Sequence, residues 1–132
     1  MSQTIHPGEV PCSHALNGAI KKLLDKNDED SKLLRKSFVF KIFPMINPDG
    51  VFHGHMRKDR FLQNLNRFYK KPNPQRQPTC YALKNIVEYF SENHRLVFFT
   101  DFHAHSGLKN VFVYGNFCNF VRQVESRLFV KI

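Results

Sequence analysis

The sequence predicts an α/β fold in which a mixed, largely parallel sheet is flanked by helices. Three short, nearly all-apolar runs, at residues 38–43, 96–99 and 111–114, are bounded by turn or polar residues. Runs of this kind are typical of strands buried on both faces. They alternate with segments whose apolar residues recur at helical spacing, which is the pattern of α/β architecture. The length of 132 residues suits one domain.

The helical segments follow one another in a clear order. Residues 11–26 begin with a proline, which is favoured in a first helical turn, and continue with apolar residues three and four apart. Residues 27–30 are polar and predict a loop, after which Ser31 is expected to cap a short helical turn. Residues 79–93 predict a second helix. The amphipathic segment 119–132 predicts a last one.

A long loop is expected between the first strand and the second helix. The tetrapeptide Asn47-Pro48-Asp49-Gly50 is typical of a turn. Residues 51–79 then show no clear period and hold many charges and three prolines. Long loops in compact domains are often functional, so this segment is a candidate binding region.

Composition and charge restrict the class of protein. With 20 Lys and Arg against 11 Asp and Glu, the net charge is +9, which favours acidic partners. We expect no nucleic-acid partner, because no RNP-like strand, Cys/His finger or basic helix is present. We expect no membrane partner, because no segment reaches the ~20 apolar residues of a membrane span. The first ten residues do not resemble a signal peptide, and Cys12, Cys80 and Cys118 form no Cys-x-x-Cys pair, so the expected location is cytoplasmic.

Candidate metal ligands lie near the two ends of the chain. His6 and Glu9 are three residues apart, with Pro7-Gly8 between them, so a tight turn at a helix start brings both toward one ion. Imidazole and carboxylate are zinc ligands. His103 directly follows an expected strand, at the end of an α/β sheet where ligands bind. His105 remains an alternative third ligand, and the His-x-His pair in the long loop is a weaker candidate.

The long loop also holds groups suited to binding a carboxylate. Arg57 and Arg67 carry planar guanidinium groups that pair with carboxylates through two hydrogen bonds, and Asn66 adds an amide. Taken alone, the same residues fit a solvated basic loop, because other cations lie nearby: Lys58, Arg60, Lys70 and Lys71.

Five stretches together resemble the zinc metallocarboxypeptidase family, peptidase family M14, and most closely its cytosolic carboxypeptidase branch. They are HPGE (6–9), FVFKIFPMINPDGV (38–51), NLNR (64–67), DFHAHS (101–106) and KNVFVYG (109–115). They run in the family's order and span most of the chain. The resemblance implies the zinc-carboxypeptidase version of the α/β fold.

The resemblance also implies a function. A water activated by zinc would remove C-terminal amino acids, in this branch glutamates from acidic protein tails such as those of tubulin. The residues that match the family's positions are His6, Glu9 and His103 for one zinc ion, Arg57 for the oxyanion, and Asn66 and Arg67 for the terminal carboxylate of the substrate.

Three departures from the family pattern shape this expectation. Asn64 stands where the family has an aspartate that supports a zinc-binding histidine. The stretch after DFHAHS is less basic than usual. Nothing after His103 matches the family's general-base glutamate, since Glu125 lies in a different context. We therefore expect residues 1–132 to form a single partial peptidase domain, the zinc-binding N-terminal half, with little activity alone. The alternative is a non-catalytic pseudo-peptidase that binds zinc or acidic tails.

Overall fold

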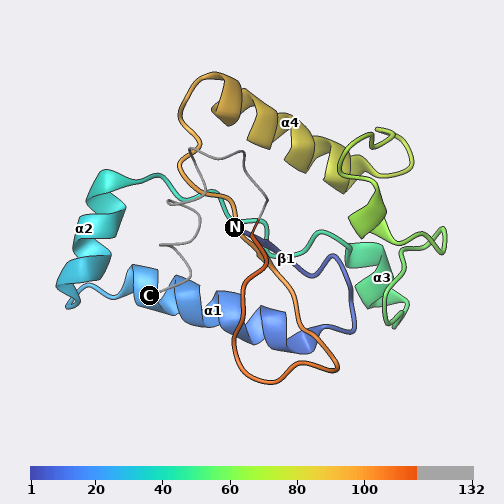
Figure 1. Cartoon of the computed structure of the whole chain (residues 1–132), viewed down its shortest axis with the longest axis horizontal. Coiled ribbons are helices and arrows are strands. Elements are labelled where there is room, and N and C mark those ends of the chain that lie inside the picture. Colours follow the sequence, from blue (N-terminus) through green and yellow to red (C-terminus); the bar gives the residue numbers. More distant parts are fainter. Residues whose placement is uncertain (116–132) are drawn as a thin grey trace.

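The computed structural model describes residues 1–115 (Figure 1). The expected helix at 119–132 lies outside these residues. The described elements are β1 (Ser2–Gln3), α1 (Val10–Leu24), α2 (Glu29–Ser37), α3 (Pro48–Phe52), the 3₁₀ helix η1 (Leu65–Arg67), α4 (Pro78–Glu92) and β2 (Asp101–Phe102). In the view of Figure 1, α1 and α4 lie on opposite sides of β1. None of the described helices is long and apolar enough to cross a bilayer.

The sheet is parallel and short. Strand β1 pairs with β2 in the register Ser2 to Asp101 and Gln3 to Phe102. Ser2 also forms a parallel bridge with Phe43. Helices and parallel strands are therefore combined as expected, and the predicted α/β class is confirmed. The β1 strand itself was not predicted, because two residues are too few to show a period.

The predicted burial of the apolar runs is wrong for the described residues. Pairing reaches only Phe43 at the end of the first run and begins at Asp101, after the second. Val39 is 83% exposed, Val97 73% and Val111 96%. A strand is buried on both faces only when other layers cover it. Within residues 1–115, strand pairing is limited to β1 with β2 and to the bridge between Ser2 and Phe43. These residues therefore do not provide the layers that would bury the apolar runs on both faces.

The first two helices follow the sequence pattern with one correction. Helix α1 has its proline in the first turn and buries Cys12 and Leu16. The cap of α2 is Asp28 rather than Ser31, because the Asp28 carboxylate accepts a hydrogen bond from the Ser31 backbone N–H at 2.7 Å. The Ser31 hydroxyl instead donates to the Lys22 carbonyl at 2.6 Å, which ties α2 to the end of α1.

The predicted turn at Asn47 is the start of a helix. The Asn47 side-chain oxygen accepts from the Gly50 N–H at 2.9 Å and caps α3. Its amide nitrogen donates to the Ile5 carbonyl at 3.1 Å. The same side chain therefore holds the start of α3 against the residue that precedes His6.

The core lies directly beneath the N-terminal motif. It is a cluster of buried residues, of which Ile5 is only 1% exposed and directly precedes His6 in the chain. The other members are Ile46, Leu65, Cys80 and Leu83. Leu65 belongs to η1 inside the expected long loop, and the last two lie on the predicted second helix, here α4. Four segments that are distant in sequence are thus anchored at one place.

Candidate metal centre

A tight turn presents the first two candidate ligands. The Glu9 N–H donates to the His6 carbonyl at 3.1 Å, and α1 begins at the next residue. The Gly8 N–H donates to the Met56 carbonyl at 2.8 Å, so the turn also rests on the long loop. His6 is buried, with 2% of its surface exposed. The predicted turn at a helix start is confirmed.

Two imidazoles converge on one carboxylate. His6 Nδ1 lies 2.7 Å from one Glu9 oxygen, and His103 Nδ1 lies 2.9 Å from the other. One ligand atom from each of the three residues lies within 4.8 Å of the others. Two imidazole nitrogens and a carboxylate are the protein ligands of a catalytic zinc that keeps its fourth position open. The donor set and its spacing therefore fit zinc.

The competing histidines do not join this group. His105 Nδ1 accepts hydrogen bonds from the backbone N–H groups of Gly107 and Leu108. The rings of His53 and His55 stack on each other in the long loop, with centroids 5.6 Å apart. Within residues 1–115 the group that could hold a metal ion is His6, Glu9 and His103, so it does not include His53, His55 or His105. Spacing alone leaves His103 and His105 open, and the geometry favours His103.

The outer nitrogens of both candidate ligands have partners. His6 Nε2 lies 3.0 Å from the Asn64 side-chain oxygen, which also accepts from the Asn66 N–H at 3.1 Å. His103 Nε2 lies 3.0 Å from an Asp101 oxygen. Both partners are acceptors, so each Nε2 can hold a proton, and each Nδ1 could then give its lone pair to a metal in place of its contact with Glu9. Asn64 thus supplies a neutral acceptor at the position where the resemblance implies an aspartate.

Asp101 is held from two further sides. Its Oδ1 accepts from the Ser2 hydroxyl at 2.7 Å, and its Oδ2 accepts from the Tyr69 hydroxyl at 3.3 Å. Sequence reasoning missed Asp101 as a functional residue. A signal was present, because residues two apart in an extended segment point to the same side, and this places Asp101 with His103. No local sequence pattern indicated that Ser2 or Tyr69 would contact Asp101.

The charges at the site stabilise one another. Burial opposes ionisation of Glu9, but hydrogen bonds from Ala104 N–H and His103 hold the Glu9 pKa below its usual value. Burial likewise opposes ionisation of Asp101, yet hydrogen bonds from His103 and Ser2 keep its pKa low. The hydrogen bond to Asp101 raises the pKa of His103 against the effect of burial. Without metal, the two carboxylates beside His103 therefore favour its protonated form.

This arrangement predicts a pH dependence for the zinc-free chain. The His103 pKa is raised from its ordinary value of 6.5, so protonated His103 stabilises the fold fully below that pH. The contribution is lost as the pH rises through the raised folded-state value. The lowered pKa values of Glu9 and Asp101 keep both carboxylates ionised throughout this window. The free energy of unfolding by urea, with EDTA present, should be lower at about pH 8.5 than at about pH 6.

A matched pair of variants isolates the cause of this pH dependence. His103→Gln should remove that difference, and His105→Gln should keep it. An unchanged pH dependence in His103→Gln would contradict the assignment.

Of the residues expected to bind the oxyanion and the substrate carboxylate, Arg57 lies beside the cluster. Arg57 Nη1 is 3.5 Å from a Glu9 oxygen, and the side chain is 52% exposed. Asn66 and Arg67 belong to η1 and follow Asn64 closely. The Arg67 guanidinium donates to the Asn66 carbonyl at 3.2 Å. Their roles toward a substrate stay predictions.

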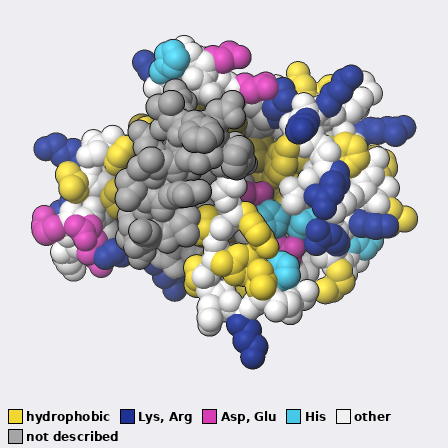
Figure 2. Space-filling view, in the orientation of Figure 1, with side chains coloured by type: hydrophobic (Ala, Val, Ile, Leu, Met, Phe, Trp, Pro, Cys, Tyr) yellow, Lys and Arg dark blue, Asp and Glu magenta, His cyan; other side chains and the backbone are white. Residues whose placement is uncertain are grey.

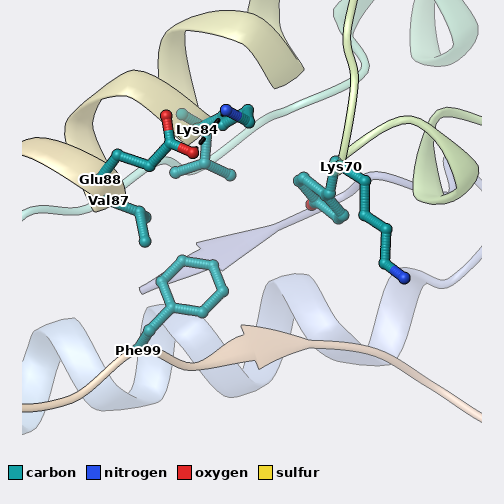
Figure 3. A pocket seen from close by; sticks show the side chains of 7 residues that line it. Lys70, Lys84, Val87, Glu88 and Phe99 are labelled. Atoms are coloured by element: carbon teal, nitrogen blue, oxygen red, sulfur yellow. Dashed lines mark hydrogen bonds and ion pairs between the residues drawn. The ribbon is translucent and has the colours of Figure 1, made fainter. Parts of the chain in front are cut away.

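A separate cavity lies between α4 and the segment that leads to β2 (Figure 3). Its volume is about 580 Å³. The lining residues are Tyr69, Lys70, Leu83, Lys84, Val87, Glu88 and Phe99. Lys84 and Glu88 form an ion pair across one turn of α4. Tyr69 thus lines this cavity while its hydroxyl reaches Asp101.

Comparison with known proteins identifies the family. The zinc carboxypeptidase family model matches residues 1–128. Cytosolic carboxypeptidase 6 of Caenorhabditis elegans is 42% identical over 118 residues, which are 88% of this chain and 26% of the relative. Cytosolic carboxypeptidase 4 of Mus musculus is 46% identical over 112 residues, 84% of this chain and 10% of the relative. The chain belongs to the zinc carboxypeptidase family, and it spans about a quarter or less of these relatives.

Solved structures agree with this assignment. A metallo-carboxypeptidase from Burkholderia cenocepacia superposes with a TM-score of 0.62 and 29% identity, over 67% of this chain and 24% of that protein. A candidate carboxypeptidase A from Shewanella denitrificans gives a TM-score of 0.64 and 34% identity, over 67% of this chain and 23% of that protein. The fold is therefore part of a metallocarboxypeptidase domain.

Proposed function

We propose that this chain forms the zinc-binding and carboxylate-binding part of a metallocarboxypeptidase active site that removes C-terminal amino acids. The observation that carries the proposal is the convergence of His6 Nδ1 and His103 Nδ1 on the Glu9 carboxylate, with one ligand atom from each residue within 4.8 Å of the others. These three residues would hold one zinc ion, which when bound lowers the pKa of a water and polarises a carbonyl.

The neighbouring groups would bind and orient the substrate. The exposed Arg57 guanidinium, next to Glu9, is suited to stabilise negative charge that develops beside the cluster. Asn66 and Arg67 would hold the terminal carboxylate of the peptide, Arg67 through two parallel hydrogen bonds. Within residues 1–115, the Glu9 carboxylate of the cluster and the Asp101 carboxylate beside it are both engaged with His103, so we expect little hydrolysis by this chain alone.

The expected substrates are acidic protein tails, including glutamate-rich tails of the tubulin type, in the cytoplasm. Support comes from the net charge of +9 and from relatives that are named cytosolic carboxypeptidases. Figure 2 shows histidine, acidic and basic side chains next to one another on one face, with further lysine and arginine side chains beside them. Such a surface attracts anionic peptides.

Peptide binding tests the proposal directly. A fluorescent peptide that ends in several glutamates should bind the zinc-loaded chain more tightly with a free C-terminal carboxylate than with a C-terminal amide. Arg67→Ala should weaken binding of the free-carboxylate peptide about tenfold or more, because a hydrogen bond to a charged group contributes about 1.5–3 kcal/mol. Lys71→Ala is the matched control, since it removes an equal charge from the same loop.

The outcomes separate the alternatives. Equal binding of the two peptides, or equal losses in Arg67→Ala and Lys71→Ala, would show general charge attraction and contradict the carboxylate site. Robust turnover that a chelator and Glu9→Gln abolish would contradict the expectation of low activity. Selective binding without turnover agrees both with the partial peptidase site and with the non-catalytic alternative.

A further inference from the structure

The two candidate metal-binding histidines have unequal partners. His6 Nε2 donates to the neutral amide oxygen of Asn64, and His103 Nε2 donates to the ionised carboxylate of Asp101, each over 3.0 Å. A carboxylate partner fixes the ring orientation and raises the basicity of a ligating imidazole, whereas a neutral acceptor fixes orientation with a smaller effect on basicity. The charged support of this centre therefore lies on the His103 side.

Asp101 is built into the fold rather than merely adjacent. Ser2 is fully buried at 0% exposure, lies in β1 opposite Asp101, and donates its hydroxyl to Oδ1 at 2.7 Å. Tyr69 packs against the hydrophobic core and donates its hydroxyl to Oδ2 at 3.3 Å. These donors approach from residues 99 and 32 positions away in sequence. With His103, they give the carboxylate three donors and hold its orientation.

We propose that Asp101, clamped by Ser2 and Tyr69, is the charged positioning residue of the metal centre, and that it compensates for the neutral Asn64. The inference rests on the proposed zinc-binding function. Asp101 acts through His103: it holds the Nε2 proton, so that Nδ1, beside Glu9, would be the nitrogen that gives its lone pair to zinc. The clamp makes this orientation part of the folded chain before any metal arrives.

The proposal is tested by exchanging the charged and neutral hydrogen-bond partners of the two histidines, Asp101 and Asn64. Zinc affinity is measured by competition with a chromophoric chelator in wild type, Asp101→Asn, Asn64→Asp and the double variant. Asp101→Asn keeps an acceptor of the same shape and should weaken zinc binding by about 10–100-fold. The double variant returns a carboxylate to the other histidine, so it should recover part of that loss. Asn64→Asp alone should bind zinc more tightly than wild type.

A second measurement reports on the hydrogen bond itself. In the zinc-loaded protein, the Nε2 proton of His103 should give a downfield N–H resonance that moves upfield in Asp101→Asn. Tyr69→Phe keeps the ring in the core and removes one donor, so it should cause a smaller, few-fold loss of affinity. This variant also serves if Asp101→Asn folds poorly.

Each outcome supports or overturns the positioning role. Wild-type zinc affinity in Asp101→Asn would overturn the proposal. A double variant that binds zinc no more tightly than Asp101→Asn would also overturn it, because the loss of affinity would then be unrelated to charge. If Asp101→Asn fails to fold, wild-type affinity in Tyr69→Phe overturns it and a few-fold loss supports it. A wild-type chain that binds no zinc would overturn the proposed function first. Absence of zinc binding by the wild-type chain is detected before any variant is compared, so failure of the proposed function can be distinguished from failure of the proposed role of Asp101.

Discussion

The His6→Ala/His103→Ala variant should lose the zinc that we expect the wild-type chain to bind at about one ion per chain. These residues supply both imidazoles of the cluster, and the carboxylate of Glu9 alone is a weak site for zinc. Metal content after dialysis against metal-free buffer measures the loss. The effect should be close to complete, because removing two of three protein ligands leaves no basis for tight binding.

Two histidines outside the cluster serve as matched controls. His105→Ala removes the rival ligand of the DFHAHS motif, and His53→Ala removes one of the stacked pair in the long loop. Both variants should retain the full zinc content. Loss of zinc in His105→Ala would mean that the metal takes the other histidine of the motif. Retention in the double variant would place the metal elsewhere.

Gly50→Ala should be the most destabilising small substitution near the site. A Cβ atom at this position would lie 2.4 Å from the Lys58 carbonyl oxygen, 2.6 Å from Pro7 Cγ and 2.7 Å from the Asn47 amide nitrogen. One of the three is backbone, which cannot turn aside as a flexible side chain does. Overpacking of this kind costs about 1–3 kcal/mol of unfolding free energy. We expect a value at the upper end, measured by urea unfolding.

The control for this prediction is another glycine in the same chain. Gly18 lies inside α1, and no described atom outside its own helical turn comes within 4 Å of the place that an alanine methyl group would take. Gly18→Ala should therefore raise the unfolding free energy, by up to about 1 kcal/mol, through helix propensity. Unchanged stability in Gly50→Ala would contradict the close approach of the α3 start to the N-terminal turn.

The consequence of Gly50→Ala should extend to metal binding. Pro7 lies between His6 and Glu9 in the turn, and Lys58 follows Arg57. A shift at Gly50 therefore moves both the ligand turn and the loop that carries the candidate oxyanion group. Weaker zinc binding in Gly50→Ala, beside unchanged binding in Gly18→Ala, would show that the turn depends on this contact.

Elements whose causes are local could be predicted from the amino-acid sequence alone. The helices α1 and α4 follow from apolar spacing, together with a first-turn proline in α1, and they lie within two residues of the predicted bounds. Pro78, which the sequence pattern assigns to the loop, is the first residue of α4. The candidate ligands, two histidines and a glutamate, could also be found from short motifs. The family could be recognised because those motifs keep their order along the chain. All of these depend on residues a few positions apart.

Features that depend on distant residues became visible only in three dimensions. The folded chain places His103 rather than His105 beside Glu9, and it joins Asp101 to Ser2 and Tyr69. It also leaves the apolar runs largely exposed within residues 1–115, although their composition predicts burial. The physical reason is that burial and hydrogen bonding depend on which surfaces meet after folding. A local pattern states only what a segment could bury or bind, and the partner supplied by the fold decides whether it does.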